Sequence, residues 1–398
     1  MENTHGKIGY LEGIRGLAAL LVFFHHFGLA FYPAYYTFGI EASHLNGLEL
    51  TYGQSVFSVF SNGNFCVFVF FVLSGFVLSR SYFHTNAFST IVSGAQRRFI
   101  RLYIPIAVTI ILSFLLLESG LYFNVPAGVI THSEWWLSSF WRFSDVPTHL
   151  VGSLLYGVMF TGDSLFDTTL SSMSIEFYGS LMVFAFLALS HNTRNRSAML
   201  FFLFLYCCFT DHLYTATFVF GISLNYIEQR RTSMSKGTAT ILATVLAFLG
   251  LLLGSFPSNG AIAGTFYERV PLEFLNVVHG WLHAIGAFFL VAAFVLSSVL
   301  QRLISLRVFI FLGYISFSLY LLHPLLIGSF SCYLFLRLSE SMAYNNAVAL
   351  VFILTLALCI PLSWLMTKFV DVPGTKFAKY VYERYAKPAV AEAGVKGK

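Results

Sequence analysis

An arginine and a histidine stand eleven residues apart in a strongly apolar segment, "YLEGIRGLAALLVFFHHFGLAFY" at residues 10–32. A helix turns by about 100° per residue, so Arg15 and His26 share one helical face and lie roughly 16 Å apart along the axis. An arginine at the centre of a membrane helix costs about 2.5–3.5 kcal/mol on insertion scales. Arginine suits phosphate, and histidine suits general-base chemistry near neutral pH. The spacing therefore fits a donor such as an acyl-CoA, whose phosphates and thioester carbonyl lie far apart.

The composition indicates a protein that resides in lipid. Of its 398 residues, 57% are hydrophobic and only 10% are charged, whereas soluble domains carry about 25% charged residues. The net charge of +5 does not indicate nucleic-acid binding, because basic residues in such chains mark cytoplasmic loops. We therefore expect an integral membrane protein whose partner is the lipid bilayer, with no nucleic acid bound.

Ten apolar segments approach the length of about 20 residues that a membrane span needs. The fifth and sixth are short and closely joined. Together, the ten segments predict an all-α fold, a polytopic transmembrane helical bundle of about ten spans. Residues 1–380 are expected to form a single integral-membrane domain, and residues 381–398 a cytoplasmic C-terminal tail. The ten segments are residues 14–34, 56–79, 100–118, 172–190, 198–211, 213–227, 238–256, 277–300, 308–331 and 346–368.

The distribution of basic residues predicts the orientation. If residues 149–160 do not cross, all but three of the 23 Lys and Arg residues fall on one side, which the positive-inside rule makes the cytoplasm. Counting 149–160 as a span would move most of these charges outward. Both termini are therefore predicted to be cytoplasmic. Residues 120–171 become an outer segment, part interfacial and part re-entrant, whose tryptophans favour the headgroup level: Trp135, Trp136 and Trp141.

Basic residues gather at the inner face in this topology. Arg98 and Arg101 are three residues apart, so they lie near one another on a helix. Arginines around a cavity mouth can hold an anion. We expect Arg98 and Arg101 to join Arg15 in this task, whereas Arg80 and Arg97 are interpreted as loop residues that follow the positive-inside rule.

The outer half is predicted to hold a carboxylate and several histidines. Glu176 lies about one turn into a helix that enters from outside, and a carboxylate in apolar surroundings needs a partner. A histidine is the expected partner, because the pairing would also orient its ring. His323 follows about four turns of an outward-running helix and precedes Pro324, where helical hydrogen bonding breaks; Ser318 and Tyr320 precede it.

His279 and His283 are four residues apart, so they share a helical face. This is also a metal-ligand spacing, but Gly280 stands where a His-Glu-x-x-His protease has its glutamate, so no metal site is predicted. Two alternatives stay open for this pair. The histidines either line the acceptor side of the cavity or make interhelical hydrogen bonds.

Several motifs resemble the membrane-bound acyltransferase 3 family, at intervals through nearly the whole chain. In the first helix, Arg15, ten further residues and His26 resemble the signature of that family. The other resemblances are "FFVLSGFVLSR" (70–80) with Ser74, "RRFIRLYIP" (97–105) with Arg98 and Arg101, "MSIEFYGSLMVF" (173–184) with Glu176, "LGYISFSLYLLHPLL" (312–326) ending in His-Pro, and "KFVDVPGTKF" (368–377) with Asp371 in place of a glutamate. Their common order and spacing carry the resemblance.

The resemblance implies an integral-membrane O-acyltransferase in the bacterial inner membrane. It would move an acyl group, in the first place acetyl, from cytosolic acyl-CoA to a hydroxyl of a carbohydrate acceptor such as lipopolysaccharide O-antigen, exopolysaccharide or glycolipid. No bound cofactor is expected. His26 would be the general base and Glu176 would orient it, with donor phosphates on Arg15, Arg98 and Arg101. Candidates for the oxyanion or acceptor side are Ser74, Ser318, Tyr320, His279, His283 and His323.

Four alternatives stay open. The acyl group could pass through a covalent intermediate on Ser or Tyr and not directly to the acceptor. A separate soluble transferase could also complete the transfer to the acceptor. A transporter or flippase would also bury His and Glu, but the sequence has no internal repeat and no paired broken helices. A structural or signalling protein would not need His26.

Overall fold

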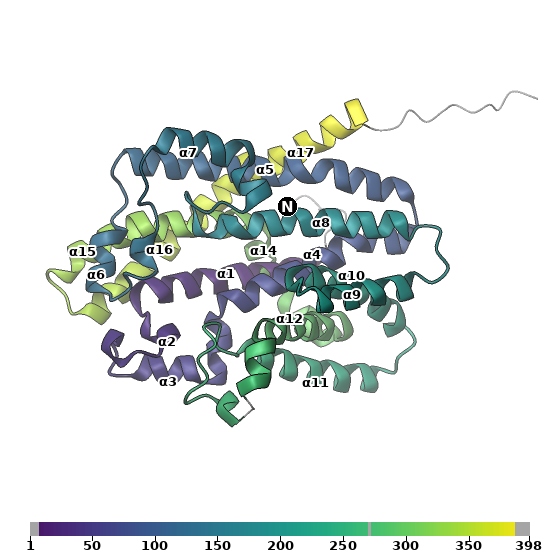
Figure 1. Cartoon of the computed structure of the whole chain (residues 1–398), viewed down its shortest axis with the longest axis horizontal. Helices are drawn as coiled ribbons and strands as arrows, with labels where there is room; N and C mark the ends of the chain where they lie inside the picture. Colours follow the sequence, from purple (N-terminus) through teal and green to yellow (C-terminus); the bar gives the residue numbers. More distant parts are fainter. Residues whose placement is uncertain (1–7, 270–271, 387–398) are drawn as a thin grey trace, which may run out of the picture.

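The structure is a computed structural model that describes residues 8–269 and 272–386, with the backbone alone for 272–279. The described part is helical and contains no strand. Each of the ten expected segments forms a helix, and the long helices lie side by side (Figure 1). They are α1 (Gly9–Phe31), α4 (Gly63–Thr85), α5 (Phe88–Glu118), α8 (Ser171–Leu189), α9 (Arg196–Phe209), α10 (Leu213–Arg231), α11 (Lys236–Gly254), α12 (Leu272–Leu296), α14 (Arg307–Leu326) and α16 (Tyr344–Met366).

Within the described residues, seven helices are long and apolar enough to cross a bilayer. An eighth results if α12 and α13 (Ser298–Ile304), which meet at a 99° bend, form one span. Helices α9 and α10, the closely joined fifth and sixth segments, do not meet the length and apolarity of a span. Helix α9 has only 14 residues, and the last turns of α10 carry Glu228, Arg230 and Arg231. The protein is a polytopic, all-α integral membrane protein.

The first helix packs closely against α14 at the centre of the bundle. Glycines permit this approach: a Cβ on Gly16 would collide with the backbone of Gly313, and a Cβ on Gly313 would collide with the carbonyl of Glu12. Small residues at such interfaces are typical of membrane bundles, where van der Waals packing drives association. The helix ends at Phe31, because Tyr32 precedes Pro33 and a residue before proline disfavours helical geometry.

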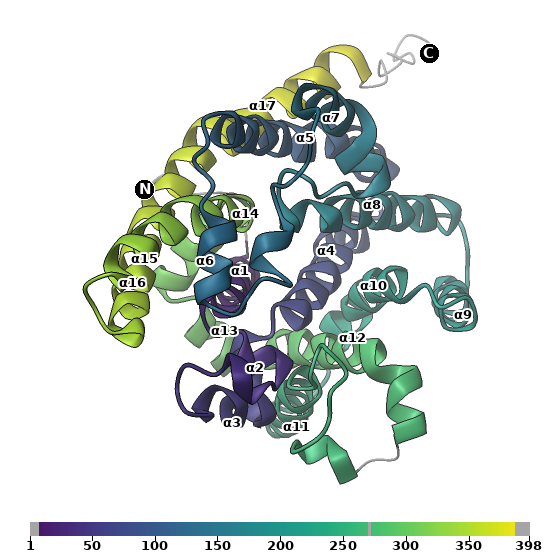
Figure 2. The same ribbon diagram turned by 60° about the vertical axis from the view of Figure 1, so that its left-hand side comes forward.

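Residues 120–171 form short helices. They are α6 (Asn124–Ile130), η3 (Leu137–Ser139), α7 (Val146–Gly152) and the π-helical η4 (Ser153–Thr161). The segment between α6 and η3 covers the carboxyl end of α1 (Figure 2), where the hydroxyl of Ser133 donates to the carbonyl of Leu29 at 2.7 Å. This contact ties a segment distant in sequence to the helix that carries His26.

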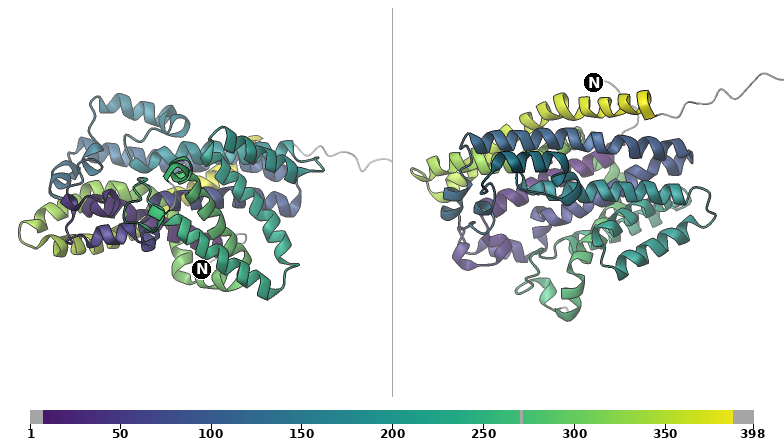
Figure 3. Two further views of the ribbon diagram at one scale, coloured as in Figure 1. Left: turned by 60° about the horizontal axis from the view of Figure 1, so that its bottom comes forward. Right: turned by 45° about the horizontal axis from the view of Figure 1, so that its top comes forward.

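Several helix boundaries differ from the prediction; α4, for example, begins at Gly63 and not at residue 56. The largest difference is in α5, which begins at Phe88 and not near residue 100, because the buried Arg98 is accommodated inside the bundle. At the other end of the chain, α17 (Val372–Val381) and η9 (Tyr382–Ala386) extend the helix beyond residue 380, and α17 packs along α5 (Figure 3). The rest of the predicted tail, 387–398, lies outside the described residues.

We predict that Gly16→Ala destabilises the bundle, since its methyl group overpacks the contact between α1 and α14, at a typical cost of about 1–3 kcal/mol. Gly152→Ala is the matched control, because a Cβ there meets nothing within 4 Å and alanine favours a helix. Thermal unfolding in detergent measures both. Equal melting temperatures for Gly16→Ala and wild type would contradict the close-packing argument.

Candidate active site

His26 and His323 form a hydrogen-bonded pair across α1 and α14. The Nδ1 atom of His26 lies 2.7 Å from Nε2 of His323, and Nδ1 of His323 lies 2.9 Å from the carbonyl oxygen of Leu319. The ring centroids are 5.0 Å apart with planes inclined by only 14°, so the bond runs nearly within both ring planes. His323 is fully buried, whereas His26 is half-buried.

The backbone determines which nitrogen of each neutral ring carries the proton. A carbonyl oxygen can only accept, so Nδ1 of His323 donates to Leu319 and its Nε2 accepts from Nδ1 of His26. The lone pair of His26 is then on Nε2, directed away from His323. His26 is therefore held in the tautomer that a general base needs, and His323 can stabilise the imidazolium that forms on proton uptake.

The indole of Trp136 stacks on the ring of His26. Its ring centroid lies 5.4 Å from that of His26, with the planes inclined by 23°. Trp136 comes from the segment that covers the end of α1. The sequence predicted only a headgroup position for Trp136, because no local pattern links two residues so far apart in the chain. The contact restricts the orientation of the His26 ring.

A cavity of about 150 Å³ lies between α1, α4, α5, α8 and α14. Arginines line one end, and Tyr320 lies at the other, one turn before His323 on α14. The cavity therefore leads from a cationic region toward the histidine pair. The polar residues that line it are Glu12, Arg15, Ser74, Arg98, Arg101, Ser172, Glu176, Tyr314, Ser316, Tyr320 and Asp371.

The partner of Glu176 is an arginine, so the prediction of a histidine partner is wrong. Arg98 is buried and donates to the carboxylate of Glu176, while its Nε donates to the hydroxyl of Ser180 at 2.8 Å. Ser74 donates to the same carboxylate at 2.7 Å. The predicted separation into an inner arginine set and an outer carboxylate also fails. Because α5 begins at Phe88, Arg98 lies a third of the way along it and reaches Glu176.

All three predicted donor-binding arginines line this cavity, but their surroundings differ. Arg98 is engaged with Glu176. Arg15 donates to Glu12, one turn earlier in α1, at 2.9 Å, and the Arg101 residue is exposed. Arg15 and Arg101 therefore present cationic groups toward an incoming anion more directly than Arg98 does.

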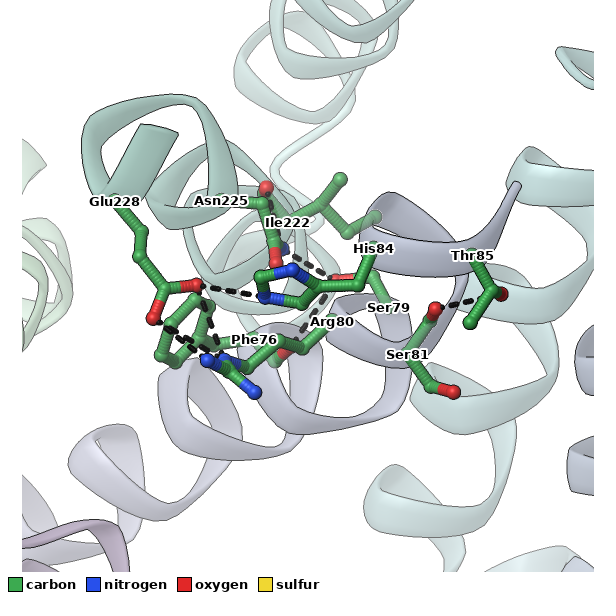
Figure 4. A network of polar contacts seen from close by, with 9 residues as sticks. All are labelled: Phe76, Ser79, Arg80, Ser81, His84, Thr85, Ile222, Asn225 and Glu228. Atoms are coloured by element: carbon green, nitrogen blue, oxygen red, sulfur yellow. Dashed lines mark hydrogen bonds and ion pairs between the residues drawn. The ribbon is translucent and has the colours of Figure 1, made fainter. Parts of the chain in front are cut away.

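Arg80 holds α4 against α10. Its guanidinium donates to the Glu228 carboxylate at 3.0–3.2 Å, and His84 lies 3.4 Å from the same carboxylate (Figure 4). Arg80 and His84 line a neighbouring cavity that shares Arg15 and Arg101 with the first. Arg80 was interpreted as a loop residue, but it lies within α4, where its ion pair with Glu228 gives it a structural role.

The predicted oxyanion donors have other partners. Ser74 gives its one hydroxyl proton to Glu176. Ser318 is fully buried, accepts a hydrogen bond from the hydroxyl of Thr367 at 2.8 Å, and does not line the cavity. Tyr320 does line it, and its hydroxyl lies 2.9 Å from that of Ser172. Ser172, a cavity residue that the sequence did not indicate, donates to the carbonyl of Thr169 at 2.8 Å, so the Tyr320 hydroxyl is the donor to Ser172. Of the three predicted residues, Tyr320 is the one whose proton could turn from Ser172 toward the cavity.

The open question on His279 and His283 is answered for one of the two. His283 is buried and its Nε2 donates to the carbonyl of Phe256 at 2.8 Å, which is the structural alternative. The side chain of His279 lies outside the described residues. Among the residues that are described, no group of three or more His, Cys, Asp or Glu side chains could hold a metal ion.

Asp167 is a buried carboxylate that sequence reasoning did not single out. Its Oδ1 accepts from the backbone N–H of Thr169 at 2.7 Å and from its hydroxyl at 2.8 Å. Within the described part of the chain, Oδ2 has no hydrogen-bond partner. Burial raises the pKa of Asp167 to about 7, so near neutral pH the folded protein retains a proton that the unfolded chain has lost.

We predict that Asp167→Asn stabilises the protein more at about pH 8 than at about pH 5. The free energy of unfolding falls from about pH 4 to about pH 7, because the unfolded chain loses the Asp167 proton first. Asparagine keeps the Oδ1 acceptor and removes the buried charge. Melting temperatures of both proteins at the two pH values test this. An equal shift at both would show that the charge is not responsible.

We also predict that Arg98→Met is strongly destabilising, because it leaves the Glu176 carboxylate buried without its cation, at a typical cost of about 3–5 kcal/mol. The double variant Arg98→Met/Glu176→Gln should recover part of the loss. Arg97→Met is the control, since Arg97 donates only to the carbonyl of Ser93. The measurement is thermal unfolding of all variants. Strictly additive losses would mean that the two side chains do not depend on one another.

Comparison with known proteins supports the family that the motifs suggest. The sequence profile of the acyltransferase 3 family, described as an acyltransferase domain, matches residues 8–367, nearly the whole chain. No curated protein and no solved structure matches. The matched range includes the histidine pair and the arginines of the cavity. The chain therefore belongs to the acyltransferase 3 family and is an integral-membrane acyltransferase.

Proposed function

We propose that this protein is an O-acyltransferase that moves an acyl group, in the first place acetyl, from cytosolic acyl-CoA to a hydroxyl of a carbohydrate acceptor. One observation carries the proposal: the His26 ring, locked by His323 with its Nε2 unprotonated, stands beyond the end of a cavity whose other end is lined by arginines. General base and anion site are thus arranged at the two ends of one path.

The donor occupies the cavity with its phosphates toward Arg15 and Arg101. Guanidinium groups suit phosphate because they donate in a planar, bidentate manner. Arg98 adds to the positive electrostatic potential of the cavity while it is paired with Glu176. In this proposal Glu176 pairs with Arg98, and His323, in place of Glu176, orients the ring of His26. The pantetheine arm then runs past Ser316 and Tyr320 toward the histidine pair.

The chemical step is a direct transfer. The acceptor oxygen attacks the thioester carbonyl carbon while Nε2 of His26 takes the hydroxyl proton. The carbon–sulfur bond breaks, the acyl group remains on the acceptor oxygen as an ester, and the sulfur of CoA leaves with the proton returned by His26. The Tyr320 hydroxyl is the nearest candidate within the cavity to stabilise the oxyanion. It would do so by turning its proton from Ser172, which itself donates to the carbonyl of Thr169, toward the reacting oxygen.

The membrane arrangement that suits this reaction has ten spans with both termini in the cytoplasm, in a bacterial inner membrane. It places the arginine end of the cavity toward cytosolic acyl-CoA and the covered end of α1 toward the other face. Acceptors of the O-antigen, exopolysaccharide or glycolipid class would meet His26 from that face. A soluble transferase partner is not required if the acceptor reaches His26 directly.

We predict that His26→Ala lowers transfer at least about 100-fold, the typical contribution of a general base, and that His323→Ala lowers it by a smaller factor. The assay supplies radiolabelled acetyl-CoA to membranes and follows base-labile label in glycan and lipid-linked sugar fractions. His212→Ala is the control, because His212 is exposed and bonds only to the nearby carbonyl of Thr210.

Label that persists in His26→Ala at equal protein level would rule out His26 as the base. Sugar movement across the membrane that continues without acyl-CoA would favour a transporter instead.

A further inference from the structure

A stacked aromatic pair stands beside the histidine site. The rings of Trp135 and Tyr36 have centroids 5.7 Å apart and planes inclined by only 16°. Tyr36 belongs to α2 (Ala34–Thr37), directly after α1, and Trp135 precedes Trp136, the residue that stacks on His26. Trp135 is nevertheless 48% exposed, so half of a large aromatic residue remains open next to the site.

The pair is connected to His26 from both sides. Trp136, the residue after Trp135, stacks on the ring of His26. Through α2, the Tyr36 ring lies 5.8 Å from that of His25, which is itself 5.4 Å from that of His26. The pair is therefore linked to His26 through two neighbours, Trp136 and His25.

Hydrogen bonds fix the segments that carry the two rings. Ser133, two residues before Trp135, donates to the carbonyl of Leu29, and the side-chain amide of Asn259 donates to the carbonyl of Tyr36. Because three separate parts of the chain hold this geometry, the pair is a built platform. A tryptophan that only anchors the protein in the headgroup region needs no such support.

The chemistry of the platform fits a sugar ring. One face of a pyranose presents C–H bonds, which pack on the electron-rich face of an aromatic ring, while its hydroxyls need polar neighbours at the rim. Glu134, next to Trp135, is exposed and offers a hydrogen-bond acceptor. We propose that Trp135 and Tyr36 bind a pyranose ring of the carbohydrate acceptor. That this sugar is the acceptor rests on the proposed function, whereas sugar binding by the two rings does not.

The test is direct binding of the purified full chain to a printed array of neutral pyranose oligosaccharides. We expect wild type to bind at least one glycan, Trp135→Ala to bind it at least tenfold more weakly, and Trp135→Phe to retain most of the binding. The control is Trp364→Ala, which removes a 37% exposed tryptophan from α16.

Absence of glycan binding by wild type, or equal binding by Trp135→Ala, would overturn the platform. The acetyl-transfer assay separates this result from the proposed function. Transfer that is insensitive to Trp135→Ala would remove the platform and leave the acyltransferase intact. Glycan binding that depends on Trp135 without transfer from any acyl-CoA would keep the platform and remove the proposed reaction.

Discussion

The hydrogen bond between His26 and His323 is the interaction on which the site depends. It requires α1 and α14 to approach closely, which Gly16 and Gly313 permit, and it requires the carbonyl of Leu319 to hold the proton on one side of the His323 ring. Pro324 modifies the same helix: it has no N–H, so the carbonyl of Tyr320 lacks its helical donor and accepts weakly from Thr169 at 3.4 Å. Helix packing and backbone chemistry together select the tautomer of His26.

A second constraint is the cost of charge inside a membrane bundle. Arg98 and Glu176 neutralise one another, with Ser74 and Ser180 completing their hydrogen bonds, as buried ionic groups require. The pair joins α5 to α8 and forms a wall of the cavity. Arg15, paired with Glu12 at its partly exposed end of α1, and the exposed Arg101 are the other cationic groups that line the cavity. Burial and pairing within the bundle thus distinguish Arg98 from these two more accessible arginines.

The segment after α5 links the two halves of the proposed chemistry. It covers the end of α1, places Trp136 on His26 and presents Trp135 on Tyr36. The cavity lies on one side of the histidine pair and this aromatic surface on the other. In the proposed reaction, donor and acceptor would arrive from opposite directions, which would keep the thioester apart from the acceptor until both are in place.

The sequence by itself determined the ten helices, the membrane environment, the shared face of Arg15 and His26, and the family, because apolarity, helical period and local motifs are properties of neighbouring residues. It did not determine which polar side chains meet. The partner of Glu176 was predicted to be histidine and is Arg98. Ser318 was expected in the cavity and bonds to Thr367. The stacking of Trp136 on His26 and the burial of Asp167 were not predicted. Only the tertiary structure decides these contacts, since a buried charge or ring finds its partner through packing between distant helices.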